Sequence, residues 1–159
     1  MLLYQNTFSS NSYQEWKSYF SNILFEKEAH AMSFIHTVKT HKNIDDVITE
    51  LTKALKEINF GVLETLDFKK ILSDKGLEFS DNYKLLEVCN PQLAKQVLEA
   101  NPDLGLLLPC TIAVYQKDDE NFISLARPTS LLSMASDKNL KFSGEEIENN
   151  LIRIIESVK

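Results

Sequence analysis

The sequence is poor in cysteine, arginine, glycine and proline, and these shortages exclude several classes of protein. Its 159 residues include two cysteines, four glycines and four prolines. Two cysteines in a chain of this length do not indicate a disulfide-stabilised secreted scaffold. Arg127 and Arg153 are the only arginines, which leaves few guanidinium groups to hold phosphates. The glycines stand apart from one another, so no glycine-rich phosphate-binding loop is expected.

Long apolar runs and a positive charge balance are also missing. No run approaches the roughly 20 apolar residues that a membrane-spanning helix needs, and no secretory leader is recognisable. The net charge is −6, which argues against nucleic acid or an anionic membrane as the main partner. We therefore expect a cytoplasmic protein that binds neither. His30, His36 and His41 show no zinc-like spacing with the cysteines, so we expect no metal site and no cofactor.

Apolar residues make up 43% of the chain, which is enough for one domain with a proper core and an appendage. Residues 1–31 are rich in serine, asparagine and aromatic residues, and Trp16, Phe20 and Ile23 recur at helical spacing. This pattern predicts an N-terminal helical extension that packs on its own domain or on a partner, with a regulatory arm as the less favoured interpretation. A single domain is expected over residues 32–159.

Periodicity and turn residues predict the elements of that domain. The expected helices are Asn43–Ile58, Asp67–Leu72, Pro91–Ala100, Pro128–Ala135 and Gly144–Val158, the last with Ser143 as its N-cap. The expected strands are Ser33–Thr40, Phe60–Leu66, Tyr83–Val88, Leu106–Tyr115 and Phe122–Ala126. The polar turn between the last two strands requires antiparallel pairing. The expected fold class is α+β, a mainly antiparallel sheet with helices packed on one face.

The two cysteines are the best candidates for chemistry. Cys89 ends an expected strand just before a helix that begins at Asn90, and exposed amides at a helix start lower the pKa of a thiol. The strand from Leu106 can pair beside the strand from Tyr83, which would bring Cys110 near Cys89. Both are therefore candidate catalytic thiols, with Cys89 the more reactive. The competing interpretation, which we favour, is that both pack as small buried apolar residues.

Polar residues near strand ends are weaker candidates. Asp67, Lys69 and Asn90 are candidate ligand-binding residues, because each follows an expected strand where a pocket could open. For Asp67 we favour a simpler interpretation, in which it is the N-cap of the short helix that follows. Glu64 and Glu87 could serve as acid–base carboxylates, but solvent-facing strand positions explain them more simply.

Four short motifs occur in a specific order: Phe60-Gly61-Val62-Leu63, Asp67-Phe68-Lys69, Cys89-Asn90-Pro91 and Gly105-Leu106-Leu107-Leu108-Pro109-Cys110. With these motifs the chain resembles the domain of unknown function family 302, from about Met32 to Val158. The resemblance implies a small α+β domain that tends to form homodimers and has no settled activity. The chain departs from the family in the extra segment 1–31. It also departs in Arg127, where an acidic residue is expected in relatives.

Two hypotheses for function follow. The first is a non-catalytic homodimer, paired through its sheet, that binds a small-molecule or protein ligand or serves in assembly. The apolar stretch Leu104–Leu108 adds to the expectation of a homodimer, the commonest soluble assembly. The second is a thiol-dependent redox or sulfur-handling protein that uses Cys89 with Cys110. The sequence leaves open whether the protein is an enzyme.

Overall fold

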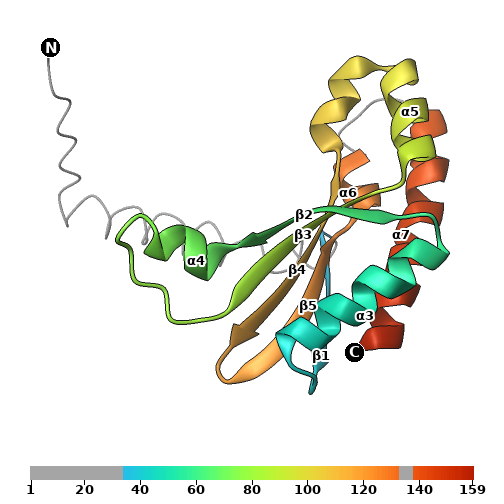
Figure 1. Ribbon diagram of the computed structural model, residues 1–159. Coiled ribbons are helices and arrows are strands. Elements are labelled where there is room, and N and C mark those ends of the chain that lie inside the picture. Colours follow the sequence, from blue (N-terminus) through green and yellow to red (C-terminus); the bar gives the residue numbers. More distant parts are fainter. Residues whose placement is uncertain (1–33, 133–137) are drawn as a thin grey trace, which may run out of the picture. The chain divides into compact units, whose positions relative to one another are not determined.

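The structure, a computed structural model, describes residues 34–132 and 138–159. The elements in chain order are β1 (Ile35–Thr40), α3 (Ile44–Glu57), β2 (Gly61–Asp67), α4 (Phe68–Ser73), β3 (Tyr83–Cys89), α5 (Pro91–Ala100), the 3₁₀ helix η1 (Pro102–Leu107), β4 (Cys110–Lys117), β5 (Glu120–Ala126), α6 (Pro128–Leu132) and α7 (Lys138–Val158). The strands form one sheet in the order β1-β5-β4-β3-β2, and every neighbouring pair is antiparallel (Figure 1). The predicted α+β class is confirmed. The predicted N-terminal helical extension lies outside the described residues.

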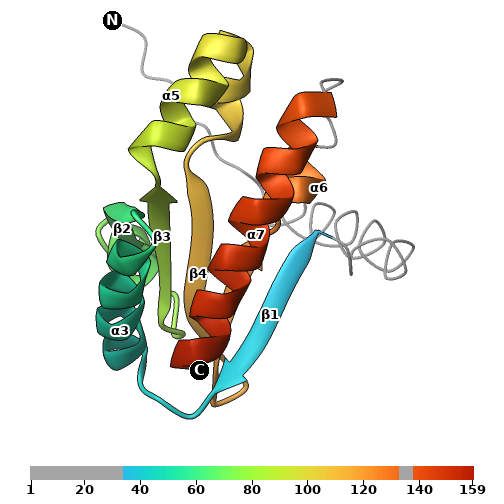
Figure 2. The ribbon, with the colours of Figure 1, turned by 90° about the vertical axis from the view of Figure 1, so that its right-hand side faces the viewer.

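Helices α3 and α7 pack side by side against one face of the sheet (Figure 2). Each presents a stripe of apolar residues at helical spacing, and the strands present every second side chain to the same layer. The fully buried side chains of this core include Leu51 and Leu55 of α3, Leu151 and Ile155 of α7, and Leu86, Ile112 and Leu125 of the strands. Helix α5 extends past the end of the sheet, where it packs against η1.

The hairpin between β4 and β5 sets which strand residues face the helices. Asp118 and Asp119 both have positive φ, 53° and 62°, as the two-residue turn of a tight hairpin requires. Lys117 pairs with Glu120 directly across this turn. A one-residue shift in the pairing of β4 with β5 would move the apolar side chains of the shifted strand to the opposite face of the sheet. The turn geometry and the burial of the core therefore require the same register.

The face opposite α3 and α7 carries a row of aromatic rings. The ring centroids of Phe68 and Tyr83 lie 5.8 Å apart, those of Tyr83 and Tyr115 5.3 Å, and those of Tyr115 and Phe122 5.6 Å. The row therefore crosses three adjacent strands from the start of α4. Tyr83, Tyr115 and Phe122 are half-buried, so the row of rings is partly accessible.

Two predicted boundaries are wrong, and in both cases packing overrides a local pattern. The expected strand Leu106–Tyr115 begins only at Cys110, because the chain before it forms η1 and buries Leu104 against Val97 of α5. Helix α7 begins at Lys138 rather than Gly144, so Ser143 lies inside the helix.

Gly144 shows why the helix continues through this point. A Cβ at this position would lie 2.7 Å from Leu132 Cδ1, so the missing side chain lets α6 approach α7 closely. Contact with α6 thus favours helix where the local sequence alone indicated a start.

Candidate functional site

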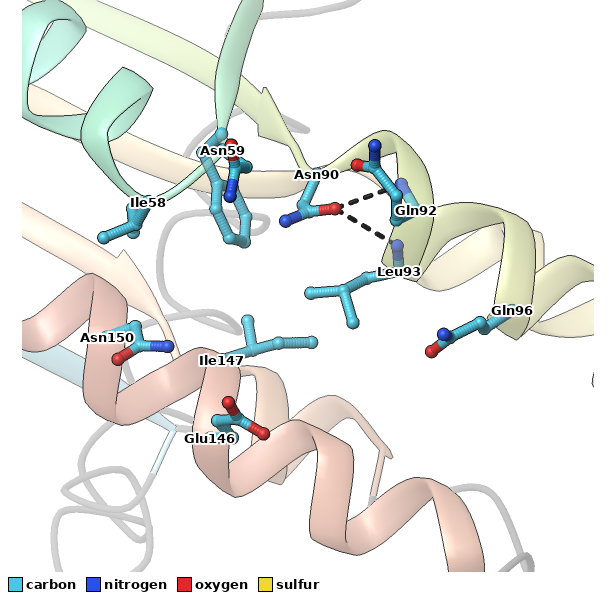
Figure 3. A pocket seen from close by; sticks show the side chains of 10 residues that line it. Ile58, Asn59, Asn90, Gln92, Leu93, Gln96, Glu146, Ile147 and Asn150 are labelled. Atoms are coloured by element: carbon cyan, nitrogen blue, oxygen red, sulfur yellow. Dashed lines mark hydrogen bonds between the residues drawn. The ribbon is translucent and has the colours of Figure 1, made fainter.

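A solvent-open groove of about 770 Å³ lies where the C-terminal end of α3, the start of α5 and helix α7 meet (Figure 3). It is lined by Ile58, Asn59, Phe60, Asn90, Gln92, Leu93, Gln96, Glu146, Ile147 and Asn150. The apolar members form a floor, and carboxamides with one carboxylate form the rim. The volume is ordinary for a small-molecule site, and the lining is more polar than such sites usually have.

Hydrogen bonds to the protein fix which way two of the carboxamides present their polar atoms. Asn90 Oδ1 accepts from the backbone amides of Gln92 at 3.0 Å and Leu93 at 3.2 Å, as an N-cap does. Asn150 Oδ1 accepts from Arg153 Nη2 at 2.6 Å. Two donors occupy Asn90 Oδ1 and one occupies Asn150 Oδ1. The amide nitrogens of both side chains, drawn in Figure 3, remain as donors toward a ligand.

The capping role of Asn90 predicts a stability effect at the site. Asn90→Ala is expected to lower the free energy of unfolding by about 1 kcal/mol, because two amides at the start of α5 lose their acceptor. Gln96→Ala, an exposed position on the same helix and groove, should change it by less than about 0.5 kcal/mol. Urea denaturation measures both. An equal loss in the two variants would show that the cap contributes nothing.

An apolar recess of about 30 Å³ adjoins the groove. It shares Phe60, Asn90, Leu93 and Ile147 with the groove, and its other lining residues are Val88, Cys89, Ala94, Val97, Leu108 and Cys110. Cys89 ends β3, Cys110 begins β4, and Cys110 pairs with Val88 across the two strands. The structure thus brings both candidate thiols to one recess, and both are free cysteines.

The thiols do not show the activation that the sequence suggested. Burial raises the pKa of Cys89, so the predicted lowering by the start of α5 is wrong. The reason is that Asn90 itself takes the amides of Gln92 and Leu93, which leaves neither for the thiolate. Burial, together with the nearby Cys89, raises the pKa of Cys110 to about 11. Both groups are therefore protonated thiols near neutral pH.

Alkaline pH is expected to weaken the native state through Cys110. Its pKa is raised from 9.0 to about 11 by folding, so between these values the folded chain keeps a proton that the unfolded chain releases. This contribution to stability is complete below pH 9 and is lost as the pH rises through 11. Two pKa units correspond to about 3 kcal/mol. Urea denaturation over this range should show a smaller loss for Cys110→Ala than for the natural chain. Equal losses would contradict the assignment.

The other sequence candidates lie away from the groove. Asp67 Oδ1 accepts from Lys70 N at 3.0 Å, so Asp67 is the N-cap of α4, as favoured. Lys69 Nζ donates to the backbone oxygen of Ser80 at 2.8 Å. Glu64 and Glu87 sit opposite each other on neighbouring strands. Only Asn90 of the three proposed ligand-binding residues lines the groove.

Sequence reasoning missed the residues that complete the rim. Gln92 and Gln96 are four residues apart on α5, and Glu146 and Asn150 are four residues apart on α7. Each pair therefore shares one helix face. A pair of polar residues beside an apolar stripe on two helices is a signal that could have marked these positions.

Two absences concern residues 34–132 and 138–159, which the structure describes. Within these ranges no three histidine, cysteine, aspartate or glutamate side chains gather as a metal site would require. Nor does any helix there have the length and apolar character to cross a membrane.

Comparison with known proteins places the chain in a family. The sequence model described as "Domain of unknown function DUF302" matches residues 36–158. The chain is similar to a solved structure described as an uncharacterized conserved protein DUF302 from Bacillus stearothermophilus, with 36% identity and a TM-score of 0.76. That similarity covers 79% of this chain and 98% of the other. No curated protein matches. The chain therefore belongs to the domain of unknown function family DUF302.

Proposed function

We propose that this protein is a non-catalytic homodimer that binds a small molecule in the groove between α5 and α7. The observation that carries the proposal is the composition of the groove, an apolar floor under a rim of carboxamides that adjoins an apolar recess. Apolar walls supply affinity in such a site, and a few placed polar groups fix the orientation of the ligand. We place the protein in the cytoplasm, where its two thiols would stay reduced.

A second polar hollow supplies an internal comparison. It measures about 490 Å³ and is lined by Asn43, Ile44, Asp45, Asn82, Lys84, Gln116 and Asn121. Lys84 Nζ lies 2.8 Å from Asp45 Oδ1 and 3.9 Å from Asp67 Oδ2, so its main charges neutralise one another. An apolar floor like that of the groove is not found among its lining residues. We therefore favour the groove.

The binding proposal is tested with pools of amino acids, amines, sugars, nucleosides and carboxylic acids. Ligand-observed NMR and thermal shift identify a binder with the natural chain. Asn150→Ala should weaken that binder, because it removes a donor from the groove. Asn82→Ala, in the second hollow, is the matched control and should leave affinity unchanged. Loss of binding in Asn82→Ala alone would place the site in the second hollow. The proposal would be refuted if none of the pools contained a binder.

The alternative is a thiol-dependent redox or sulfur-handling protein, and one observation favours it. Cys89 and Cys110 line the same recess, and Cys89 contributes to the raised pKa of Cys110. Their raised pKa values oppose it, because the thiolate is the reactive form. Hydrogen peroxide followed by intact-mass measurement separates the two proposals. A reversible loss of two hydrogens would support a disulfide, with the peroxide reduced to water. An unchanged mass would favour the ligand-binding proposal over the thiol-dependent one.

A further inference from the structure

We infer that the groove takes a small aliphatic molecule that carries a carbonyl acceptor and a free amine, the chemistry of an aliphatic amino acid or its amide. This inference rests on the proposed function and narrows it to a ligand class. Three features carry it: the orientation of two carboxamides, the charge of the rim, and the apolar recess.

The side-chain amides of Asn90 and Asn150 favour a ligand that carries a hydrogen-bond acceptor. Asn90 and Asn150 each use the side-chain oxygen within the protein, Asn90 for the start of α5 and Asn150 for Arg153. Their amide nitrogens can only donate, so a carbonyl or carboxylate oxygen on a ligand between α5 and α7 would meet two donors. Arg153 reaches Asn150 at 2.6 Å, and its charge favours the acceptor end of the ligand near this side chain.

The carboxylate of Glu146 favours a ligand that carries a hydrogen-bond donor. Among the described residues that line the groove, Glu146 is the one with a charged side chain. It lies one turn before Asn150 on the same face of α7, and Figure 3 shows both on the wall opposite Asn90. A ligand amine at Glu146 would form a charge-assisted hydrogen bond, whereas an anionic group there would be repelled.

The recess selects the remaining part of the ligand. Its volume of about 30 Å³ admits the methyl tip of a branched side chain and is too small for an aromatic ring. The walls of the recess are apolar, so an aliphatic tip that enters exchanges water for apolar contacts. Cys89 and Cys110 then act as part of the recess wall, which agrees with protonated thiols.

Three amides test the assignment on the full natural chain by NMR titration. L-leucinamide carries all three features, N-acetyl-L-leucinamide lacks the free amine, and glycinamide lacks the aliphatic tail. L-leucinamide should bind more tightly than each of the others, by on the order of tenfold for the amine and tenfold or more for the tail. Equal affinity for L-leucinamide and either analogue would overturn the inference.

Paired variants locate each effect. Glu146→Gln should remove the preference for the free amine, and Glu145→Gln, the exposed neighbour outside the groove, should retain it. Ala94→Leu should fill the recess and reduce L-leucinamide to the affinity of glycinamide, whereas Ala100→Leu on the same helix should not. A preference that survives Glu146→Gln or Ala94→Leu contradicts the assignment.

The outcomes also separate this inference from the proposed function. If none of the three amides binds while another pool member binds at the groove, the ligand class is wrong and the binding domain stands. If no compound of any kind binds at the groove, the proposed function itself fails. The comparison of the three amides uses the natural chain, so it remains decisive even if a variant does not fold.

Discussion

Replacing Arg127 with methionine is expected to lower the free energy of unfolding by about 3 kcal/mol. Arg127 Nη1 donates to Glu148 Oε1 at 2.8 Å, and Glu148 is only 7% exposed. The other carboxylate oxygen accepts from the backbone amide of Thr129 at 3.1 Å and from its hydroxyl. Without the arginine, Glu148 remains buried with its charge uncompensated. Urea denaturation of the purified variant measures the loss.

Two further variants separate the buried charge from other causes. Arg153→Met removes an arginine from an exposed position on α7 and should cost less than about 0.5 kcal/mol. The double variant Arg127→Met/Glu148→Met removes both charges and should recover part of the loss, because a buried pair can often be replaced by apolar residues of similar volume. A double variant no more stable than Arg127→Met would contradict this explanation.

Tyr115→Glu is expected to convert the proposed homodimer to a monomer at tens of micromolar protein. Tyr115 lies in the middle of the aromatic row, with its ring 5.3 Å from Tyr83 and 5.6 Å from Phe122. In a two-fold interface each substitution occurs twice, so two carboxylates would be buried in apolar surface without partners. Light scattering coupled to size exclusion measures the mass.

Leu106→Glu is the matched control for the sheet interface. Leu106 is 90% exposed on η1, at the end of the molecule that carries α5 (Figure 1). The variant should remain dimeric if the two sheets face each other. A monomeric Leu106→Glu with a dimeric Tyr115→Glu would move the interface to the Leu104–Leu108 stretch. A natural chain of monomer mass would refute the dimer altogether.

The fold was largely predictable because burial imposes simple periodicities. The stripe of α3 and the alternation of the strands both repeat along the chain, so the predicted elements lie within a few residues of the observed ones. Asn43 and Asn90, at the starts of two predicted helices, are the N-caps of α3 and α5. The errors fall at Leu106 and Ser143, where packing against the preceding helix, α5 or α6, decides the local structure.

The site was predictable only in part, because it joins residues about fifty positions apart. Asn90 was recognised from its place between a strand and a helix, but its partners across the groove lie on α7. No local pattern shows that Glu146 and Asn150 meet α5. The direction of the Cys89 pKa differs from the expected one for a related reason, since the sequence did not show that the Asn90 side chain would occupy the amides expected to lower it.

The most direct test of the groove as the ligand site is the NMR spectrum of the asparagine side-chain amides in the full chain. The tightest binder from the pools is added to isotope-labelled protein whose amide signals have been assigned by substitution. The signals of Asn59, Asn90 and Asn150, which line the groove, should shift and saturate together. Those of the second hollow, from Asn43, Asn82 and Asn121, should not move. Saturable shifts in the second set with none in the first would contradict the account.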